Sequence, residues 1–493
     1  MRIELKNLFF PAAGKLRRPS FAASVFPILF LLVMLVGIIV GGNADLINTY
    51  SPAILLTATA ICLLLGRVCG SYSRRSLMLG VRRSAVQILP AVPMLLCISM
   101  VATTWMLSGV VPTLIDYGLH IINPTFFLAI ACAVCAAVSV LTGSSWSTIA
   151  TIGVAFMGIG TVLGYSEAWI AGAIISGAYF GDKMSPLSDT TVVASSACGV
   201  DLFKHIRYMM LTSAPAMAVA LAVYAVVGLA GPGEGAVSTE EMIGGLRAAF
   251  NITPAVLVIP AITVTLLVLR VPTLLVLACS AATGAAGIYV FQPEVVDALG
   301  NMPLHRMLWG ETALSTGSEL LDSLAGTSGI IGMLPTIALV LSAMVFGAAM
   351  IGTGMIATIT HAITRRLSRR EGIVGTTVAS GLFLNSCTAD QYLSLIIGGN
   401  MYRNVYRRAG LEPRLLSRTM EDSVSVTSVL IPWNSCGVTQ SAVLGVATIV
   451  YLPCCIFNLM SPLMSIVMAL TGFKIRSTRS LGTLSAKSMQ RAV

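Results

Sequence analysis

The sequence predicts an all-α polytopic membrane protein with two inverted-topology repeats, each containing a re-entrant hairpin and a discontinuous transmembrane helix. This gives about ten full spans plus two hairpins. Of the 493 residues, 56% are hydrophobic and only 10% are charged, whereas soluble domains carry about 25% charged residues. Basic residues cluster between apolar stretches, and polar strings interrupt two of those stretches. The composition excludes a soluble multidomain enzyme.

Several apolar stretches are each long enough to cross a hydrocarbon core of about 30 Å. They are residues 21–40, 52–65, 87–107, 209–229, 252–269, 273–290 and 330–359. The first stretch follows basic residues and lacks a small-residue cleavage site. We therefore interpret it as a retained helix and not as a signal peptide.

The net charge of +10 indicates membrane orientation and no nucleic-acid partner, because Lys and Arg favour the cytoplasmic ends of spans. All but three of the 30 basic residues fall in clusters that we assign to the cytoplasm. The exceptions are Arg247 and Arg306 outside and Lys183 within the membrane. The same assignment predicts cytoplasmic N- and C-termini.

The first hairpin is predicted from a gap in the basic residues. No Lys or Arg occurs between Arg83 and Lys183, and segment 124–160 has acidic residues on both flanks. Both flanks should lie outside, so the chain enters and returns with a tip at residues 142–148. A chain that starts and ends outside could also make two full crossings. The Gly- and hydroxyl-rich tip favours a hairpin, because irregular backbone at membrane depth must line a cavity.

The second hairpin is predicted by the same reasoning, but with basic residues on both flanks. One apolar stretch, 372–401, lies between the strongly basic segments 365–370 and 403–418. A single crossing would place one basic segment outside, against the charge rule. A hairpin entered from the cytoplasm, with its tip at residues 385–391, satisfies the rule for both segments.

These elements divide the chain into two repeats with the same order and opposite polarity. Residues 1–232 hold the first hairpin and a broken helix at 168–200, and residues 247–493 hold the second hairpin and a broken helix at 421–437. Residues 233–246 form a predicted periplasmic linker. Inverted repeats with broken helices are typical of secondary transporters, whose substrate sites lie between the repeats.

Few of the 20 acidic residues lie in apolar surroundings. Those that do are Asp182, Asp189, Asp390, Glu421 and Asp422. An ionisable group within the membrane costs about 2.5–3.5 kcal/mol on insertion scales and marks an ion or proton pathway by default. We therefore predict that these five bind Na+ or protons.

Two prolines explain the predicted breaks. Pro186 cannot donate a backbone N–H, and Ser185 suits a helix N-cap, so one half-helix should end near Gly181 and the next begin near Ser185. Pro432 does the same in the second repeat. The free carbonyls can bind a cation and the free N–H groups a carboxylate. The neutral oxygen ligands expected nearby are Ser144, Ser145, Ser185, Thr190, Thr427, Ser428 and Asn434.

Structural interpretations of the same residues remain open. Lys183 is interpreted as a charge partner for Asp182 or Asp189 in preference to a substrate ligand. Glu421 and Asp422 follow a basic loop, so solvated interfacial carboxylates are an equal alternative. The other three carboxylates could instead be buried groups that fix a helix break.

Other chemistries find little support. The 11 cysteines lie mostly in apolar segments, where Cys behaves as a small hydrophobe, and we expect no cofactor. The four histidines lie in or near predicted loops, so none is assigned a proton relay. Trp146 and Trp433 are expected to pack. An intramembrane hydrolase would need a His base and a Gly-x-Ser-x-Gly elbow, which the sequence lacks.

The polar strings resemble the Na+/H+ antiporter NhaC family. The matching segments are GDKMSPLSDTT at 181–191, DQYLS at 390–394, EDS at 421–423 and LIPWNSCG at 430–437. The resemblance implies a bacterial inner-membrane exchanger, in a superfamily whose members are often homodimers. Val192 and Val429 depart from the Asn and Pro that the family commonly has there.

We therefore predict a Na+/H+ antiporter in which protons and Na+ compete for shared buried carboxylates. If the carrier crosses only with neutralised carboxylates, charge burial forbids the empty return and couples the two fluxes. The alternative is an organic-acid or amino-acid exchanger, for example of malate and lactate. We favour the inorganic cation because no Arg lies in either break and Lys183 is the only predicted buried cation.

Overall fold

The described residues are almost entirely helical. The computed structural model describes residues 19–40, 46–69, 72–89, 91–231, 239–312, 314, 322, 326–364 and 369–475. No strand occurs within these ranges, and β-structure is limited to isolated bridge residues such as the antiparallel pair Thr312 and Thr327. The predicted all-α class is confirmed. Both chain termini, and with them the predicted cytoplasmic ends, lie outside the described residues.

The helices of the first half run from α2 to α12. In chain order they are α2 Phe21–Val40, α3 Leu46–Cys69, α4 Arg74–Ile88, α5 Ala91–Leu107, α6 Val110–Ile121, η1 Pro124–Phe126, α7 Phe127–Thr142, α8 Ser145–Thr148, the π-helical η2 Ile149–Gly153, α9 Val154–Val162, α10 Glu167–Met184, α11 Asp189–Cys198 and α12 Leu202–Leu229.

The second half runs from α13 to α26. Its helices are α13 Thr239–Ala249, η3 Pro254–Leu257, α14 Val258–Val268, α15 Thr273–Phe291, α16 Pro293–Ala298, α17 Leu304–Trp309, α19 Gly329–Gly352, α20 Met355–Thr364, α21 Arg370–Thr388, α22 Gln391–Arg408, α23 Pro413–Met420, the π-helical η4 Glu421–Ser425, η5 Ser428–Leu430, α24 Ser435–Leu444, α25 Thr448–Tyr451, η6 Leu452–Cys454 and α26 Ile456–Thr471.

The chain is a multi-pass membrane protein. Among the described residues, 7 helices are long and apolar enough to cross a membrane, or up to 9 if each sharply bent pair counts as one span. The predicted span 330–359 is divided into α19 and α20 by a turn at Gly354, whose φ is 73°. The predicted linker is partly helical, because α13 begins at Thr239. The prediction of ten spans stays a prediction.

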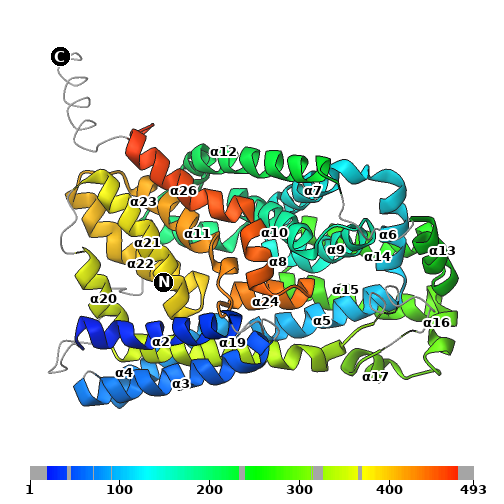
Figure 1. Cartoon of the computed structure of the whole chain (residues 1–493), viewed down its shortest axis with the longest axis horizontal. Helices are drawn as coiled ribbons and strands as arrows, with labels where there is room; N and C mark the ends of the chain where they lie inside the picture. Colours follow the sequence, from blue (N-terminus) through cyan, green and yellow to red (C-terminus); the bar gives the residue numbers. More distant parts are fainter. Residues whose placement is uncertain are drawn as a thin grey trace, which may run out of the picture.

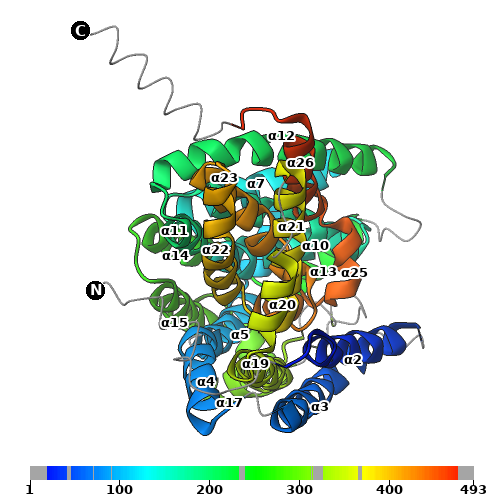
Figure 2. The ribbon, with the colours of Figure 1, turned by 90° about the vertical axis from the view of Figure 1, so that its left-hand side faces the viewer.

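The helices form two layers (Figures 1 and 2). In one layer, α19 packs on α3 and α4, and α15 packs on α5. In the other, α10 packs on α7, α12 packs on α26, and α21 packs on α22 and α26. The layers meet where α19 contacts α21 and α24, and where α5 contacts α24. Both predicted tips and both predicted helix breaks lie in the second layer. The helices on either side of the first tip, Pro124–Thr142 and Ser145–Val162, are each among the 7 apolar helices, so two full crossings stay open there.

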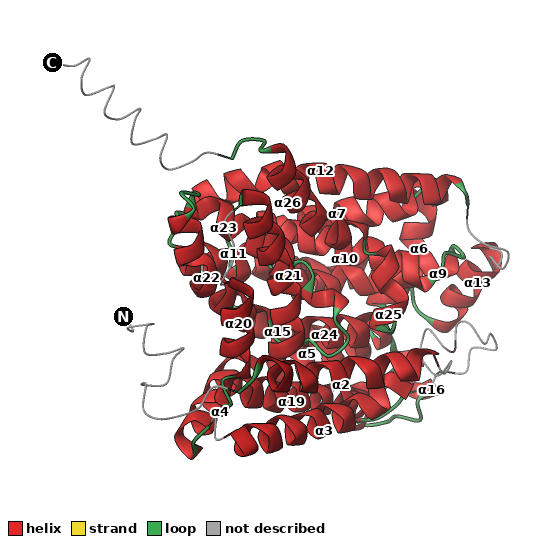
Figure 3. Cartoon of the chain, turned by 60° about the vertical axis from the view of Figure 1, so that its left-hand side comes forward, coloured by secondary structure: helices red, strands yellow, loops and turns green. Residues whose placement is uncertain are grey.

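The two ends of the bundle differ in charge. Figure 3 shows α4, α20, α22 and α23 at one end and α6, α13 and α16 at the other. Arg407 and Arg408 occupy the last turn of α22 at the first end. At the opposite end, Arg247 of α13 donates two hydrogen bonds to Asp116 of α6, at 3.0 and 3.1 Å. The first end thus carries two adjacent arginines, whereas the arginine at the opposite end is paired with a carboxylate.

Both predicted tips contain a tight turn with the same local design. After α7 the chain turns at Gly143, which has a φ of 70°, and Ser144 caps α8. After α21 it turns at Ala389, which has a φ of 55°, and Asp390 caps α22. A left-handed residue followed by an N-cap ends one helix and begins the next within two residues.

Glycines bring α10 into backbone contact with α7. A Cβ atom at Gly177 would collide with the carbonyl oxygen of Cys132, and one at Gly181 with that of Ala136. Ser139 of α7 also donates a hydrogen bond to a backbone carbonyl of α10 at 2.6 Å. Small residues allow such close approach within membranes, so the first hairpin is held against the end of α10.

Gly177→Ala should therefore destabilise the protein by about 1–3 kcal/mol, because the methyl group has no room and the α7–α10 pair must separate. Thermal unfolding in detergent, followed by loss of the monodisperse chromatographic peak, would measure the change. Gly372→Ala is the matched control, since a Cβ there meets nothing within 4 Å. Equal melting of both variants would contradict the close contact.

Candidate functional site

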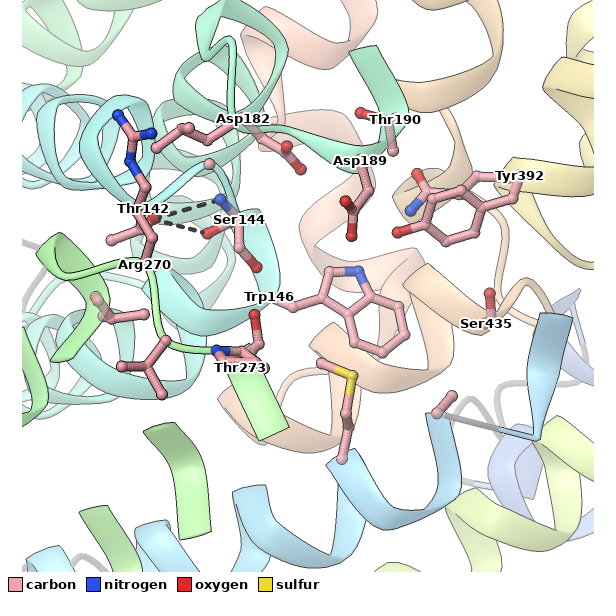
Figure 4. Close-up of a pocket in the computed structure, with 18 of the residues that line it drawn as sticks. Thr142, Ser144, Trp146, Asp182, Asp189, Thr190, Arg270, Thr273, Tyr392 and Ser435 are labelled. Atoms are coloured by element: carbon pink, nitrogen blue, oxygen red, sulfur yellow. Dashed lines mark hydrogen bonds between the residues drawn. The ribbon is translucent and has the colours of Figure 1, made fainter. Parts of the chain in front are cut away.

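A cavity of about 520 Å³ lies between the two layers (Figure 4). Its walls come from α5, the connection between α14 and α15, both hairpin tips, the first helix break and the start of α24. Three of the five predicted carboxylates line it, namely Asp182, Asp189 and Asp390. Elements far apart in the sequence thus bring acidic groups together in one polar cavity.

The first helix break lies later than predicted. The helix α10 continues past Gly181 to Met184, and Ser188 is the N-cap of α11, with its Oγ accepting from the Thr191 amide at 3.4 Å. The prediction that Ser185 caps the second half-helix is wrong. A residue before proline is forced into an extended conformation, and Ser185, with φ −83° and ψ 132°, follows that rule before Pro186.

The first tip and the break meet at Asp182. Its Oδ2 accepts a hydrogen bond from Ser145 Oγ at 2.7 Å and one from the Ser145 amide at 3.3 Å. Asp189, at the start of α11, is exposed to the cavity. Figure 4 shows the polar ends of Asp182, Asp189 and Tyr392 pointing toward the same part of the cavity. Ser144 and Thr190 also line it.

Asp390 contributes from the second tip and also supports the fold. Its Oδ1 accepts from the amide of Leu393 at 2.8 Å, which makes it the N-cap of α22, and only 2% of the residue is exposed. The neighbouring Ala389 carbonyl accepts from the amide of Ser435 at 2.9 Å, which joins this tip to α24.

The side chains predicted as neutral ligands around the second break form hydrogen bonds with backbone groups. Asn434 caps α24 through the Cys436 amide at 3.1 Å, and Thr427 donates to a backbone carbonyl at 2.7 Å. Ser428 does the same at 2.7 Å. None of these three lines the cavity. Pro432 lies in the irregular segment before α24, as predicted.

Glu421 and Asp422 lie in η4, outside the cavity, and both are 0% exposed. The alternative of solvated interfacial carboxylates is therefore wrong. Asp422 pairs with Lys183, so the prediction of Asp182 or Asp189 as the partner of that lysine is also wrong. Consecutive helical residues point in different directions, and α10 turns Asp182 to the hairpin tip and Lys183 to η4.

Hydroxyl groups complete the shell of Asp422. Ser461 donates to Oδ1 at 2.9 Å, Thr212 donates to Oδ1 at 3.3 Å, and Ser465 donates to Oδ2. Lys183 also donates to Ser461 at 3.0 Å. A buried ion pair is tolerated when such bonds replace lost hydration. Both oxygens of Asp422 thus have partners, and its role as an ion ligand stays a prediction.

Sequence reasoning missed several functional candidates. Arg418 is buried beside Asp422 at 4.0 Å, which overturns the prediction of Lys183 as the only buried cation. The four-residue spacing of Arg418 and Asp422 on a helix could have indicated this pair. His205 is buried in α12, although it was placed in or near a loop. Arg270, which was assigned to the cytoplasmic basic residues, lines the cavity. Tyr392 also lines the cavity.

A cavity that is lined by three carboxylates and by the ends of interrupted helices, in a chain of apolar spans, is typical of secondary transporters. A sequence profile described as the Na+/H+ antiporter family matches residues 177–473. The chain is 34% identical to the "Na(+)/H(+) antiporter NhaC" of Alkalihalophilus pseudofirmus, over 92% of this chain and 97% of the relative. The chain belongs to the Na+/H+ antiporter family.

Relatives whose names give other substrates match this chain with similar identity and coverage. The "Arginine/ornithine antiporter ArcD" of Halobacterium salinarum is 32% identical over 93% of both chains. The "Malate-2H(+)/Na(+)-lactate antiporter" of Bacillus subtilis is 32% identical over 88% of this chain and 92% of the relative. The solved structure of Neisseria gonorrhoeae MtrF, 13% identical, covers 92% of this chain and 95% of that chain with a TM-score of 0.33.

Lys183→Ala should destabilise the protein by about 3–5 kcal/mol, because it leaves the buried Asp422 carboxylate without its cation. Arg370→Ala, which breaks the half-exposed pair with Glu371, should cost no more than about 1 kcal/mol. Thermal unfolding of both variants in the same detergent provides the comparison. Similar costs for the two variants would contradict the assigned role of the Lys183 pair.

Proposed function

We propose that this protein is a Na+/H+ antiporter of the inner membrane that exchanges protons and Na+ at the shared carboxylates of the cavity. The observation that carries the proposal is the convergence of Asp182, Asp189 and Asp390 from both hairpin-containing parts of the chain. Membership of the family supports it. The relevant activity is transport and not catalysis.

The cavity offers the oxygen ligands that a hard cation prefers. Asp189 is exposed to it, and the hydroxyl of Ser144 lies on the same wall. A charged carboxylate is costly to move through the membrane, so either Na+ or a proton must neutralise it before the carrier crosses. Competition of the two cations for the same oxygens makes their movements opposite and coupled.

A second cavity supports alternating access. It has a volume of about 840 Å³ and is lined by α5, α6, α9, α19 and the end of α24, including Ser441 and Leu444. Ser435, at the beginning of α24, lines the first cavity. The two cavities therefore adjoin opposite ends of α24, as expected of a transporter whose central site opens to each side in turn.

The proposed topology has two inverted repeats, residues 1–232 and 247–493, joined by the segment 233–246 on the periplasmic side. The similar turns at Gly143 and Ala389 support it, as does the gathering of arginine-bearing helix ends at one face. On this topology both termini are cytoplasmic. A homodimer follows from the family resemblance and remains a prediction.

Exchange of a small organic ion is the second candidate. The cavity is far larger than a bare Na+ ion and lies in the volume range of small-molecule sites. Arg270, Trp146 and Tyr392 line it together with the carboxylates, so it contains a cation and aromatic surfaces as well as anions. This arrangement favours a solute such as an amino acid or a hydroxy acid.

Asp182→Asn and Asp189→Asn should each abolish Na+-induced proton movement, because an amide cannot hold the exchanged proton or balance the charge of Na+. The assay is a pH-sensitive dye in proteoliposomes of purified protein, with Na+, Li+, K+, malate, lactate, arginine and ornithine added in turn. Asp297→Asn is the matched control, since Asp297 is exposed on α16.

Wild-type exchange by either cavity variant would refute the role of that carboxylate. Proton movement driven by an organic solute and not by any alkali cation would replace the first candidate by the second. Because all arms use the same vesicles, protein amount and dye, the two outcomes are distinguished within one experiment.

A further inference from the structure

Glu421 is a buried carboxylate without a hydrogen bond. It is 0% exposed, and neither Oε1 nor Oε2 has a hydrogen-bond partner among the described residues. Its nearest ionisable partner is His205 of α12, whose Nε2 lies 4.0 Å from Oε2. That separation exceeds a hydrogen bond. A buried carboxylate left in this way is costly, and such groups in native proteins require an explanation.

The hydrogen bonds of His205 indicate which ring nitrogen faces Glu421 as an acceptor. Its Nδ1 lies 2.9 Å from Ser417 Oγ, and that hydroxyl can donate to the Arg414 carbonyl at 3.2 Å. In the tautomer in which the hydroxyl donates to the Arg414 carbonyl, Nδ1–H of His205 donates to Ser417. The neutral ring then presents a lone pair at Nε2, which has no hydrogen-bond partner among the described residues. In that tautomer two acceptors face one another without a hydrogen between them.

Charged groups around Glu421 do not supply the missing donor. Lys183 is already paired with Asp422, which leaves the buried Arg418 as the remaining cation of the cluster. Its Nη1 contacts Met468, its guanidinium stacks on Tyr208 at 4.7 Å, and its Nε and Nη2 have no hydrogen-bond partner. Ionised Glu421 balances Arg418, so the cluster has a net charge of zero, and a bound proton makes it +1.

The remaining ionisable groups that act on Glu421 come from the adjacent helices. Asp182 of α10 acts on it electrostatically, and Cys198 of α11 is influenced by it. The hydroxyls of Thr190 and Ser425 face the carboxylate from α11 and from η4 itself.

We propose that Glu421 and His205 form a proton-binding site separate from the carboxylate cavity, in which one proton is held between Glu421 Oε2 and His205 Nε2. The only covalent change is the formation of one O–H or N–H bond from a proton of the solvent. The product is a hydrogen-bonded pair that satisfies both acceptors.

The position of this site suggests how it is used, an inference that depends on the proposed antiport function. Asp182 faces the cavity and its neighbour Lys183 belongs to the Glu421 cluster. A cation that enters the cavity beside Asp182 repels a proton held at Glu421, and departure of the cation allows the proton to return. The site would thus carry a proton of the exchange cycle.

Two transport assays on the same proteoliposomes test the proposal. Exchange of radiolabelled Na+ for Na+ requires only the cavity, whereas Na+-driven proton movement uses the proton site in addition to the cavity. Glu421→Gln and His205→Gln should retain Na+/Na+ exchange and move fewer protons per Na+ than the wild-type protein. Asp189→Asn should lose both. Glu412→Gln is the matched control and should retain both, because Glu412 pairs with Arg414 outside the cluster.

Each outcome bears on one proposal. Wild-type Na+-driven proton movement in both Glu421→Gln and His205→Gln would overturn the proton site and leave the antiport function intact. Absence of any Na+-linked movement in the wild-type protein would instead refute the antiport function. If Glu421→Gln elutes as an aggregate in size-exclusion chromatography, His205→Gln decides by the same criterion, because it removes the imidazole and leaves the Glu421 carboxylate in place.

Discussion

The buried ion pair between Lys183 and Asp422 connects residues 239 positions apart and joins the end of α10 to η4. Neither charge could remain in this environment alone, because each would lose its hydration without compensation. The hydroxyls of Ser461, Ser465 and Thr212 complete the shell. This single contact fixes the position of α10, and therefore of Asp182, relative to the second half of the chain.

The cavity depends on a different kind of restraint. Its carboxylates stand at helix ends, where free backbone amides and neighbouring hydroxyls supply hydrogen bonds to a negative charge. Asp390 shows the cost of this arrangement, since one of its oxygens is committed to the cap of α22. Asp189 is the carboxylate most exposed to the cavity. The three acidic groups of the cavity are therefore not equivalent, although they share residue type and location.

Composition and charge patterning were sufficient to predict the all-α class and several of the apolar helices, because hydropathy over about 20 residues is a strong signal. They also identified the polar strings and their prolines. The partner of Lys183 could not be predicted, because it depends on how two distant segments pack. Arg418 and His205 were misassigned for a related reason. Both are near helix ends in sequence, but α26 packs against Arg418, and Ser417 of α23 packs against His205.

The contact of α10 with α7 limits how this helix can move. Gly177 and Gly181 seat its backbone on that of α7, while Asp182 and Lys183, separated by about 100° of helical rotation, serve two different sites. Rotation of α10 about its own axis would break the contact of these glycines with the α7 backbone. It would also change the surroundings of the two charged residues. The packing therefore predicts that any shift or tilt of α10 carries α7 with it.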